Sequence, residues 1–222
     1  MKKSTAPLSR ESDRVEDELR RLILTLELEP GSAVSEAALM QRYGWGRTPL
    51  REAFQRLAEQ SLVRIAPRQG VFITDLSVFD FVEMMDAMAM VIGTAASLAC
   101  KRLTDEEFAR LEGLAARGEA AGERKDFVQL AELDYEFHRI LAGATGNRYL
   151  GRYLMHLHRT ATRFNFATWR RDGSARASID EHGRILAALR GRDPLEARAV
   201  MLAHIEQARQ RVMGAMIASP GE

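Results

Sequence analysis

Hydrophobic residues near the start of the chain recur at the three- and four-residue spacing that places them on one face of a helix. Val15, Leu19 and Ile23 follow this spacing, and the Glu-Pro-Gly sequence at residues 29–31 predicts the end of that helix. Two short helices and two β-rich runs joined as a hairpin are predicted beyond it, at residues 35–44, 47–60, 62–65 and 70–73. This order predicts a winged helix-turn-helix domain over residues 1–76.

From residue 77 onward the pattern is helical throughout. Breaks rich in glycine, aspartate and proline divide it into six predicted helices, near residues 78–102, 104–124, 126–144, 147–170, 174–191 and 194–217. No internal repeat is visible, which favours a bundle over a solenoid. The sequence therefore predicts a mainly α-helical protein, with an antiparallel helical bundle over residues 77–222 after the winged domain.

The composition is typical of a folded protein of one or two domains. The 222 residues are 46% hydrophobic, and 16 Gly and 6 Pro are too few for a low-complexity chain. The single cysteine, Cys100, cannot form a disulfide within the chain, which favours a reducing compartment. No signal peptide is visible, and the apolar run from Met84 to Cys100 contains Asp86 and is shorter than the roughly 20 residues of a membrane span. We expect a cytoplasmic protein without a membrane segment.

Positive charge is concentrated between Arg42 and Arg68, where six arginines stand against two glutamates, although the net charge of the whole chain is only +1. Arg47 and Arg51 lie one turn apart at the start of the third helix, on the side opposite Leu50 and Phe54. Guanidinium groups suit phosphates and the edge of guanine, so this end of the helix is predicted to enter the major groove of DNA. A solvated helix face is the alternative for each arginine taken alone.

Three segments, Gly46-Arg-Thr-Pro-Leu-Arg-Glu-Ala-Phe54, Glu29-Pro-Gly31 and Pro67-Arg-Gln-Gly-Val71, resemble the DNA-binding domain of GntR-family transcriptional regulators. The resemblance covers roughly residues 12–75. It implies that the recognition helix and the wing contact DNA through Arg47, Thr48, Arg51, Arg68 and Gly70. Two positions depart from the family pattern, because Gly46 stands where members often have a serine cap and Ala37 where some have an arginine. The operator sequence of relatives is therefore not expected to transfer.

Polar residues interrupt the apolar faces of three predicted bundle helices. Asp134 and His138 lie four residues apart on one face, and His182 and His204 lie on the inward faces of two later helices. Buried polar groups need partners, and one metal ion would serve all four. Three imidazoles and a carboxylate suit zinc, our first expectation, or nickel, manganese or iron, and do not suit calcium or magnesium. A hydrogen-bonded core histidine is the alternative for each position alone.

The same four residues, with Gly146-Asn147 and Glu181 before His182, resemble the FCD ligand-sensing domain of the FadR-type GntR subfamily over about residues 78–215. The resemblance implies that Asp134, His138, His182 and His204 bind a divalent metal and that a small organic acid binds over it.

One departure concerns the first bundle helix. Members often have an arginine and, four residues on, a glutamate, where this chain has Met88 and Ile92. Without that cation, a smaller or more apolar monocarboxylate is favoured as the effector. His156, Thr160 and Arg163 on the fourth bundle helix are candidates for lining the same pocket, and solvated or paired side chains are the equal alternative.

Together these patterns predict a homodimeric transcriptional regulator and not an enzyme. Two winged domains would bind an inverted repeat in double-stranded operator DNA, and the bound acid would change the dimer and lower its DNA affinity. A metal-dependent enzyme acting on a small carboxylate is the alternative from another class, since a metal with an open position can activate water. No convincing general base stands beside the four expected ligands, which counts against that alternative.

Overall fold

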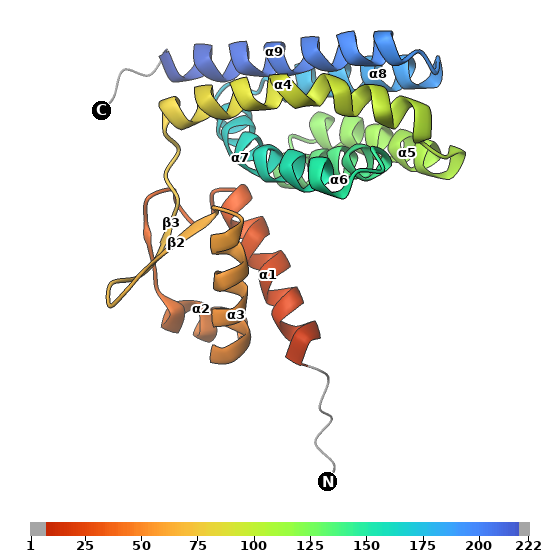
Figure 1. The fold of residues 1–222 in the computed structure, drawn as a ribbon. Coiled ribbons are helices and arrows are strands. Elements are labelled where there is room, and N and C mark those ends of the chain that lie inside the picture. Colours follow the sequence, from red (N-terminus) through yellow and green to blue (C-terminus); the bar gives the residue numbers. More distant parts are fainter. Residues whose placement is uncertain (1–7, 218–222) are drawn as a thin grey trace. The chain divides into compact units, whose positions relative to one another are not determined.

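The computed structural model describes residues 8–217 and divides into two compact units between Leu76 and Ser77. The described part of the first unit contains three helices and a small sheet (Figure 1). Its elements are α1 (Leu8–Leu24), β1 (Ala33–Val34), α2 (Glu36–Tyr43), α3 (Arg47–Glu59), β2 (Val63–Ala66) and β3 (Gly70–Ile73). The sheet is antiparallel in the order β1-β3-β2, so the predicted winged helix-turn-helix fold is confirmed.

Local signals fix the ends of the short helices. The Ser35 hydroxyl accepts a hydrogen bond from Ala38 N at 3.2 Å, and Gly44 ends α2 in the left-handed conformation at a φ of 71°. The predicted first strand of the hairpin begins one residue too early, at Leu62. The Leu62 amide instead donates to the Leu57 carbonyl at 3.0 Å, which closes the end of α3. The two-residue strand β1 was not predicted.

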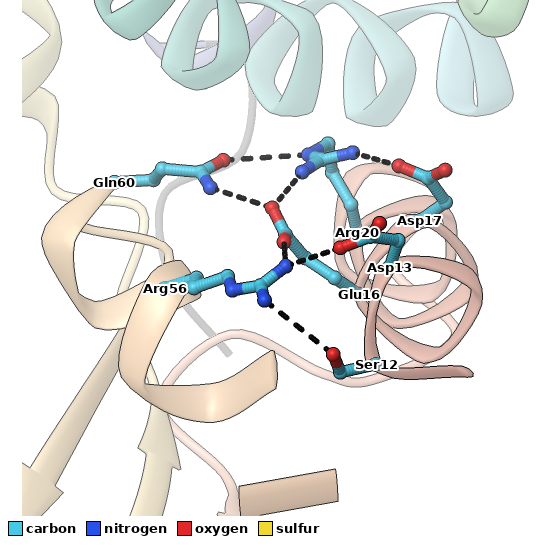
Figure 2. Close-up of polar contacts among 7 residues, drawn as sticks. All are labelled: Ser12, Asp13, Glu16, Asp17, Arg20, Arg56 and Gln60. Carbon is cyan, nitrogen blue, oxygen red and sulfur yellow. Dashed lines mark hydrogen bonds and ion pairs between the residues drawn. The ribbon is translucent and has the colours of Figure 1, made fainter. Parts of the chain in front are cut away.

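A continuous hydrophobic core joins α1 to α3 and the sheet, with Leu19, Leu50 and Phe54 at most 1% exposed. A polar network adds to this core where the two helices face each other. Figure 2 shows Glu16 of α1 in contact with Arg56 of α3 and with Gln60, the residue that follows α3. The orientation of α3, which carries the predicted DNA-contacting residues, is therefore set by both apolar and polar contacts with α1.

The second unit is a bundle of six helices within the described residues. They are α4 (Val78–Arg102), α5 (Asp105–Glu123), α6 (Phe127–Ala144), α7 (Arg148–Asp172), α8 (Ala175–Arg190) and α9 (Pro194–Ile217). All twelve bounds lie within two residues of the prediction. Figure 1 shows α4 and α9 side by side, and α4 also packs against α6 and α7. The inner faces of α6, α7, α8 and α9 carry the four buried histidines of the bundle.

Helix α4 corrects one argument made from the sequence. The apolar run at residues 84–100 belongs to a helix of 25 residues, which is long and apolar enough to cross a membrane. The length of this helix therefore does not exclude a membrane span. The contacts of α4 with α6, α7 and α9 account for its buried apolar residues, and a central helix of a bundle meets the same criterion.

Candidate metal centre and nucleic-acid interface

The predicted DNA-contacting residues of the recognition helix lie on the surface of the first unit. Arg47, Thr48 and Arg51 are exposed at the start of α3, whereas Leu50 on its other side is fully buried. Arg51 Nε lies 3.3 Å from Glu36 Oε2 of α2, yet 64% of the Arg51 side chain remains exposed. An exposed pair of this kind contributes little to stability, so its guanidinium is available to another anion.

The wing presents Arg68 and Gly70 on a tight turn between β2 and β3. The Gln69 amide donates to the Ala66 carbonyl at 3.1 Å, with Pro67 and Arg68 as the central residues of the turn. Arg68 has a φ of 65°, and Gly70 has a φ of 108°, a conformation that favours glycine. Both residues are exposed, so the arginine and the adjacent bare backbone are accessible at the wing.

The structure brings the four predicted metal ligands together inside the bundle. Asp134 and His138 come from α6, His182 from α8 and His204 from α9, and none is more than 8% exposed. Asp134 Oδ1 lies 3.3 Å from His182 Nε2 and 3.9 Å from His138 Nε2. One ring nitrogen from each of His138, His182 and His204 lies within 4.8 Å of the other two.

Two buried atoms in this cluster make no hydrogen bond with any described residue. They are Asp134 Oδ2 and His182 Nε2. A buried polar atom without a partner is disfavoured by about 1–3 kcal/mol. Unused lone pairs on a buried carboxylate and a buried imidazole are the donors that a divalent transition metal binds. The residues present therefore fit a metal ion.

Burial governs the protonation of the cluster. It lowers the pKa of His182 to about 4, with Asp134 opposing the shift, and it lowers the pKa of His138 well below 6.5. Burial alone would raise the pKa of Asp134, but the neighbouring His158, His138 and His182 outweigh it and hold that pKa far below its usual range. At neutral pH the carboxylate is ionised and these two imidazoles have free lone pairs, the state that binds metal.

Glu181 positions one of the ligands from outside the cluster. His204 Nδ1 lies 2.7 Å from Glu181 Oε2, and because a carboxylate only accepts, Nδ1 carries the proton and Nε2 keeps its lone pair. Arg211 donates to both oxygens of the same carboxylate, with Nη2 at 2.9 Å from Oε2. Carboxylates that orient ligating histidines in this way are typical of metal sites.

A cavity with one polar wall adjoins the cluster. Asp134, His138, His158 and His204 lie on its polar side. Asn165 is the remaining polar residue among the described residues that line it. The other walls are apolar, formed by Phe81, Met85, Met88, Ile92, Ala95, Ala96, Leu141, Ala142, Leu154, Met155, Ala161, Met201, Ile205 and Ala208. No lysine or arginine is among these described lining residues.

The three effector-contacting candidates on α7 are not among the residues that line this cavity. His156 and Thr160 are half-buried and Arg163 is buried, but all three lie on the opposite side of the helix from Leu154, His158 and Asn165. At 100° per residue the two sets are about half a turn apart. The lining of this cavity therefore does not support the expected contact of these three residues with an effector.

His158 is the functional candidate that sequence reasoning missed. Its side chain is buried, and its Nε2 lies 3.2 Å from Asp134 Oδ2. The signal was present in the sequence, because His158 is in phase with Leu154 and Ala161 at i−4 and i+3, whereas His156 is in phase with the exposed Tyr149 and Arg152.

Comparison with known proteins gives the family. The family of bacterial regulatory proteins named gntR matches residues 11–73, and the FCD domain family matches residues 83–207. The chain belongs to the GntR family and carries an FCD domain. The Nta operon transcriptional regulator of Aminobacter aminovorans is 30% identical over 186 residues, which cover 84% of this chain and 87% of that protein. The transcriptional repressor RspR of Escherichia coli K12 is 26% identical over 208 residues, 94% of this chain and 90% of that protein.

Solved structures show the same fold. The E. coli protein McbR/YncC matches with a TM-score of 0.81 at 21% identity, covering 91% of this chain and 97% of that chain. A GntR regulator from Rhodococcus sp. RHA1 matches with a TM-score of 0.73, also at 21% identity, covering 93% of this chain and 98% of that chain. This GntR/FCD protein is therefore a DNA-binding transcriptional regulator and not an enzyme, and the comparisons offer nothing in favour of the metal-dependent enzyme.

Proposed function

We propose that this regulator is a homodimer whose affinity for operator DNA is controlled by a small monocarboxylic acid bound beside a metal ion in the FCD domain. The observation that carries the proposal is the buried cluster of Asp134 and histidines, which forms the polar wall of an otherwise apolar cavity. In the proposal, Arg47, Thr48 and Arg51 read the DNA, and Arg68 and Gly70 of the wing approach the backbone or the minor groove.

Asp134, His138, His182 and His204 would hold a divalent transition metal. When bound, the ion would supply a Lewis-acidic position for a carboxylate oxygen. Glu181 holds the His204 ring in the required tautomer, and the lowered pKa values keep His138 and His182 free of protons at neutral pH. Glu181 thus orients the site, and the two neutral histidines are ready to bind the ion.

The apolar walls define the class of effector. Met88 and Ile92, the residues that replace the arginine and glutamate of many relatives, both line the cavity. A second carboxylate would therefore be desolvated there without a cation to pair with, which is strongly unfavourable. A monocarboxylate with an aliphatic or aromatic body fits these walls, and Asn165 offers one hydrogen-bonding group to it.

The homodimer is supported by two large, exposed apolar side chains on α4. Phe79 and Met90 are 83% and 81% exposed, and their separation of three helical turns places them on one side of the helix. Glu83 and Asp86 lie between them on that side, so the proposed interface is mixed, with the two apolar side chains as its anchors. A symmetric dimer would present two winged domains to an inverted repeat.

Selection of bound genomic fragments by the purified protein tests the proposal, followed by fluorescence anisotropy on the enriched fragment. We expect an inverted repeat to be enriched by the wild type and not by Arg51→Ala. Monocarboxylates should then lower the affinity of the metal-loaded protein for that repeat and leave the chelator-treated protein unaffected. Operator binding that no carboxylate alters in the metal-loaded protein would refute effector control while leaving DNA binding intact.

A further inference from the structure

A fifth donor faces the four residues of the proposed metal site. His158 of α7 is 7% exposed and lines the cavity on the same wall as Asp134 and His138. The donor atoms of these three residues all lie within 4.8 Å of one another. The ring of His158 also lies against that of His138, with centroids 4.2 Å apart. The histidine is thus part of the cluster and not a neighbour of it.

His158 and Asp134 are within hydrogen-bonding distance, but their contact lacks the alignment of a hydrogen bond. Nε2 and Oδ2 are 3.2 Å apart, yet Oδ2 makes no aligned hydrogen bond with any described residue. The Thr162 hydroxyl donates to the His158 carbonyl at 2.9 Å, and the Thr162 oxygen makes only a long hydrogen bond, of 3.4 Å, with His158 Nε2. Ligands of one transition-metal ion lie about 2.1 Å from it, which leaves adjacent donor atoms about 3 Å apart. The separation suits two donors that converge on one ion.

We propose that His158 is a fifth protein ligand of the metal, an inference that rests on the metal site in the proposed function. The donor set is then one carboxylate and four imidazoles, contributed by α6, α7, α8 and α9. Five protein donors exceed the four of a tetrahedral zinc site and suit an ion that accepts six ligands, such as nickel, manganese or iron. One position remains, which a carboxylate oxygen can occupy.

The fifth ligand also joins the metal to the wall of the cavity. His158, Leu154, Ala161 and Asn165 follow one another on the cavity face of α7. With His158 bound, a change in the coordination of the ion acts directly on the helix that contacts the body of the effector. Without it, α7 would touch the effector and leave the ion to three other helices.

Cobalt(II) titration of the chelator-treated full-length protein tests this inference, because cobalt absorption reports coordination number and calorimetry reports affinity. We compare the wild type with His158→Ala and the milder His158→Gln, and circular dichroism checks that each variant is folded. His156→Ala is the matched control, a histidine two residues away on the same helix that does not line the cavity. His138→Ala is the positive control for loss of an expected ligand.

We expect wild-type protein to bind one cobalt ion with the weak visible absorption of a high coordination number. His158→Ala and His158→Gln should bind about 10–100-fold more weakly, with a spectrum changed toward lower coordination, while His156→Ala matches the wild type. Wild-type affinity and spectrum in both folded His158 variants would overturn the fifth ligand, although His138→Ala still weakens binding. No cobalt, nickel or zinc binding by the wild type would instead overturn the metal site of the proposed function itself.

Discussion

Removal of the Glu16 carboxylate tests how firmly α1 holds the recognition helix. The Glu16 side chain is only 11% exposed and accepts hydrogen bonds from Arg20 and from Gln60 Nε2, the latter at 2.9 Å (Figure 2). It also accepts from Arg56 at 3.2 Å, but the Arg56 side chain is 39% exposed and this pairing adds little. Hydrogen bonds to a charged group contribute about 1.5–3 kcal/mol each when one partner is lost.

Neither arginine is left without a carboxylate in Glu16→Ala. Arg20 retains Asp17 at 2.6 Å and Arg56 retains Asp13 at 2.5 Å, so the loss is closer to one such hydrogen bond than to three. We therefore expect the free energy of unfolding of the first unit to fall by about 2 kcal/mol. Asp17→Ala is the matched control, because its carboxylate is 75% exposed and an exposed pair is worth about 0–1 kcal/mol.

Urea unfolding followed by fluorine NMR measures this difference in the intact protein. With 5-fluorotryptophan incorporated, Trp45 reports on the first unit and Trp169 on the bundle. Glu16→Ala should move the transition reported by Trp45 and leave that of Trp169 in place. Equal midpoints at Trp45 for Glu16→Ala and Asp17→Ala would refute the reasoning, since the buried carboxylate would then matter no more than an exposed one.

Four further outcomes are expected. Arg51→Ala should weaken operator binding by about 1–3 kcal/mol, measured by anisotropy at fixed salt, and full affinity would remove Arg51 from the interface. In the metal-free protein, the pKa of His182 is about 4 when folded and 6.5 when unfolded, so stability is present above pH 6.5 and is lost as pH falls toward 4. Between pH 7 and pH 5 this one residue should lower the unfolding free energy of the bundle by about 2 kcal/mol, and a flat profile at Trp169 would contradict its burial. Chelation should lower the melting temperature of the bundle by about 5–10 °C relative to protein in metal at a hundred times its Kd, and equal melting curves would argue against a bound ion. Phe79→Asp should yield monomers in light scattering, whereas Leu195→Asp, an equally exposed apolar position on α9, should not.

The helices could be predicted from sequence because their ends are set by nearby residues. Thr104 and Glu107 form a capping box at α5, and Asn147 caps α7 through bonds to two amides in its first turn. These signals act over three or four residues and can be read directly. The short strand β1 has no such signal, because Ala33 and Val34 become a strand only by pairing with Phe72 and Val71 of β3.

Residues of the candidate site could be predicted wherever the apolar side of a helix was identified from the sequence. The apolar stripes of three helices are interrupted by Asp134, His138, His182 and His204. The sequence therefore indicated that these four residues face the interior of the bundle. On α7 two histidines stand two residues apart, and residues at that spacing face different sides of a helix. Only His158 continues the apolar stripe of Leu154 and Ala161. This spacing indicates that His158, and not His156, faces the interior. The spacing of residues along one helix could not show that His158 approaches Asp134, because this contact depends on how α6 packs against α7.

Charge balance in the bundle supports the proposal of a cation and a single anion at this cluster. Its two buried carboxylates differ in their partners, because Glu181 is paired with Arg211, whereas the basic side chains within 4 Å of Asp134 among the described residues are all histidines. Burial keeps His138 and His182 uncharged at neutral pH, so they do not neutralise the Asp134 carboxylate. Binding of a divalent ion would change the net charge of this cluster from one negative to one positive. A monocarboxylate would then leave the dry cavity neutral, whereas a dicarboxylate would bury a negative charge against apolar walls that offer it no partner.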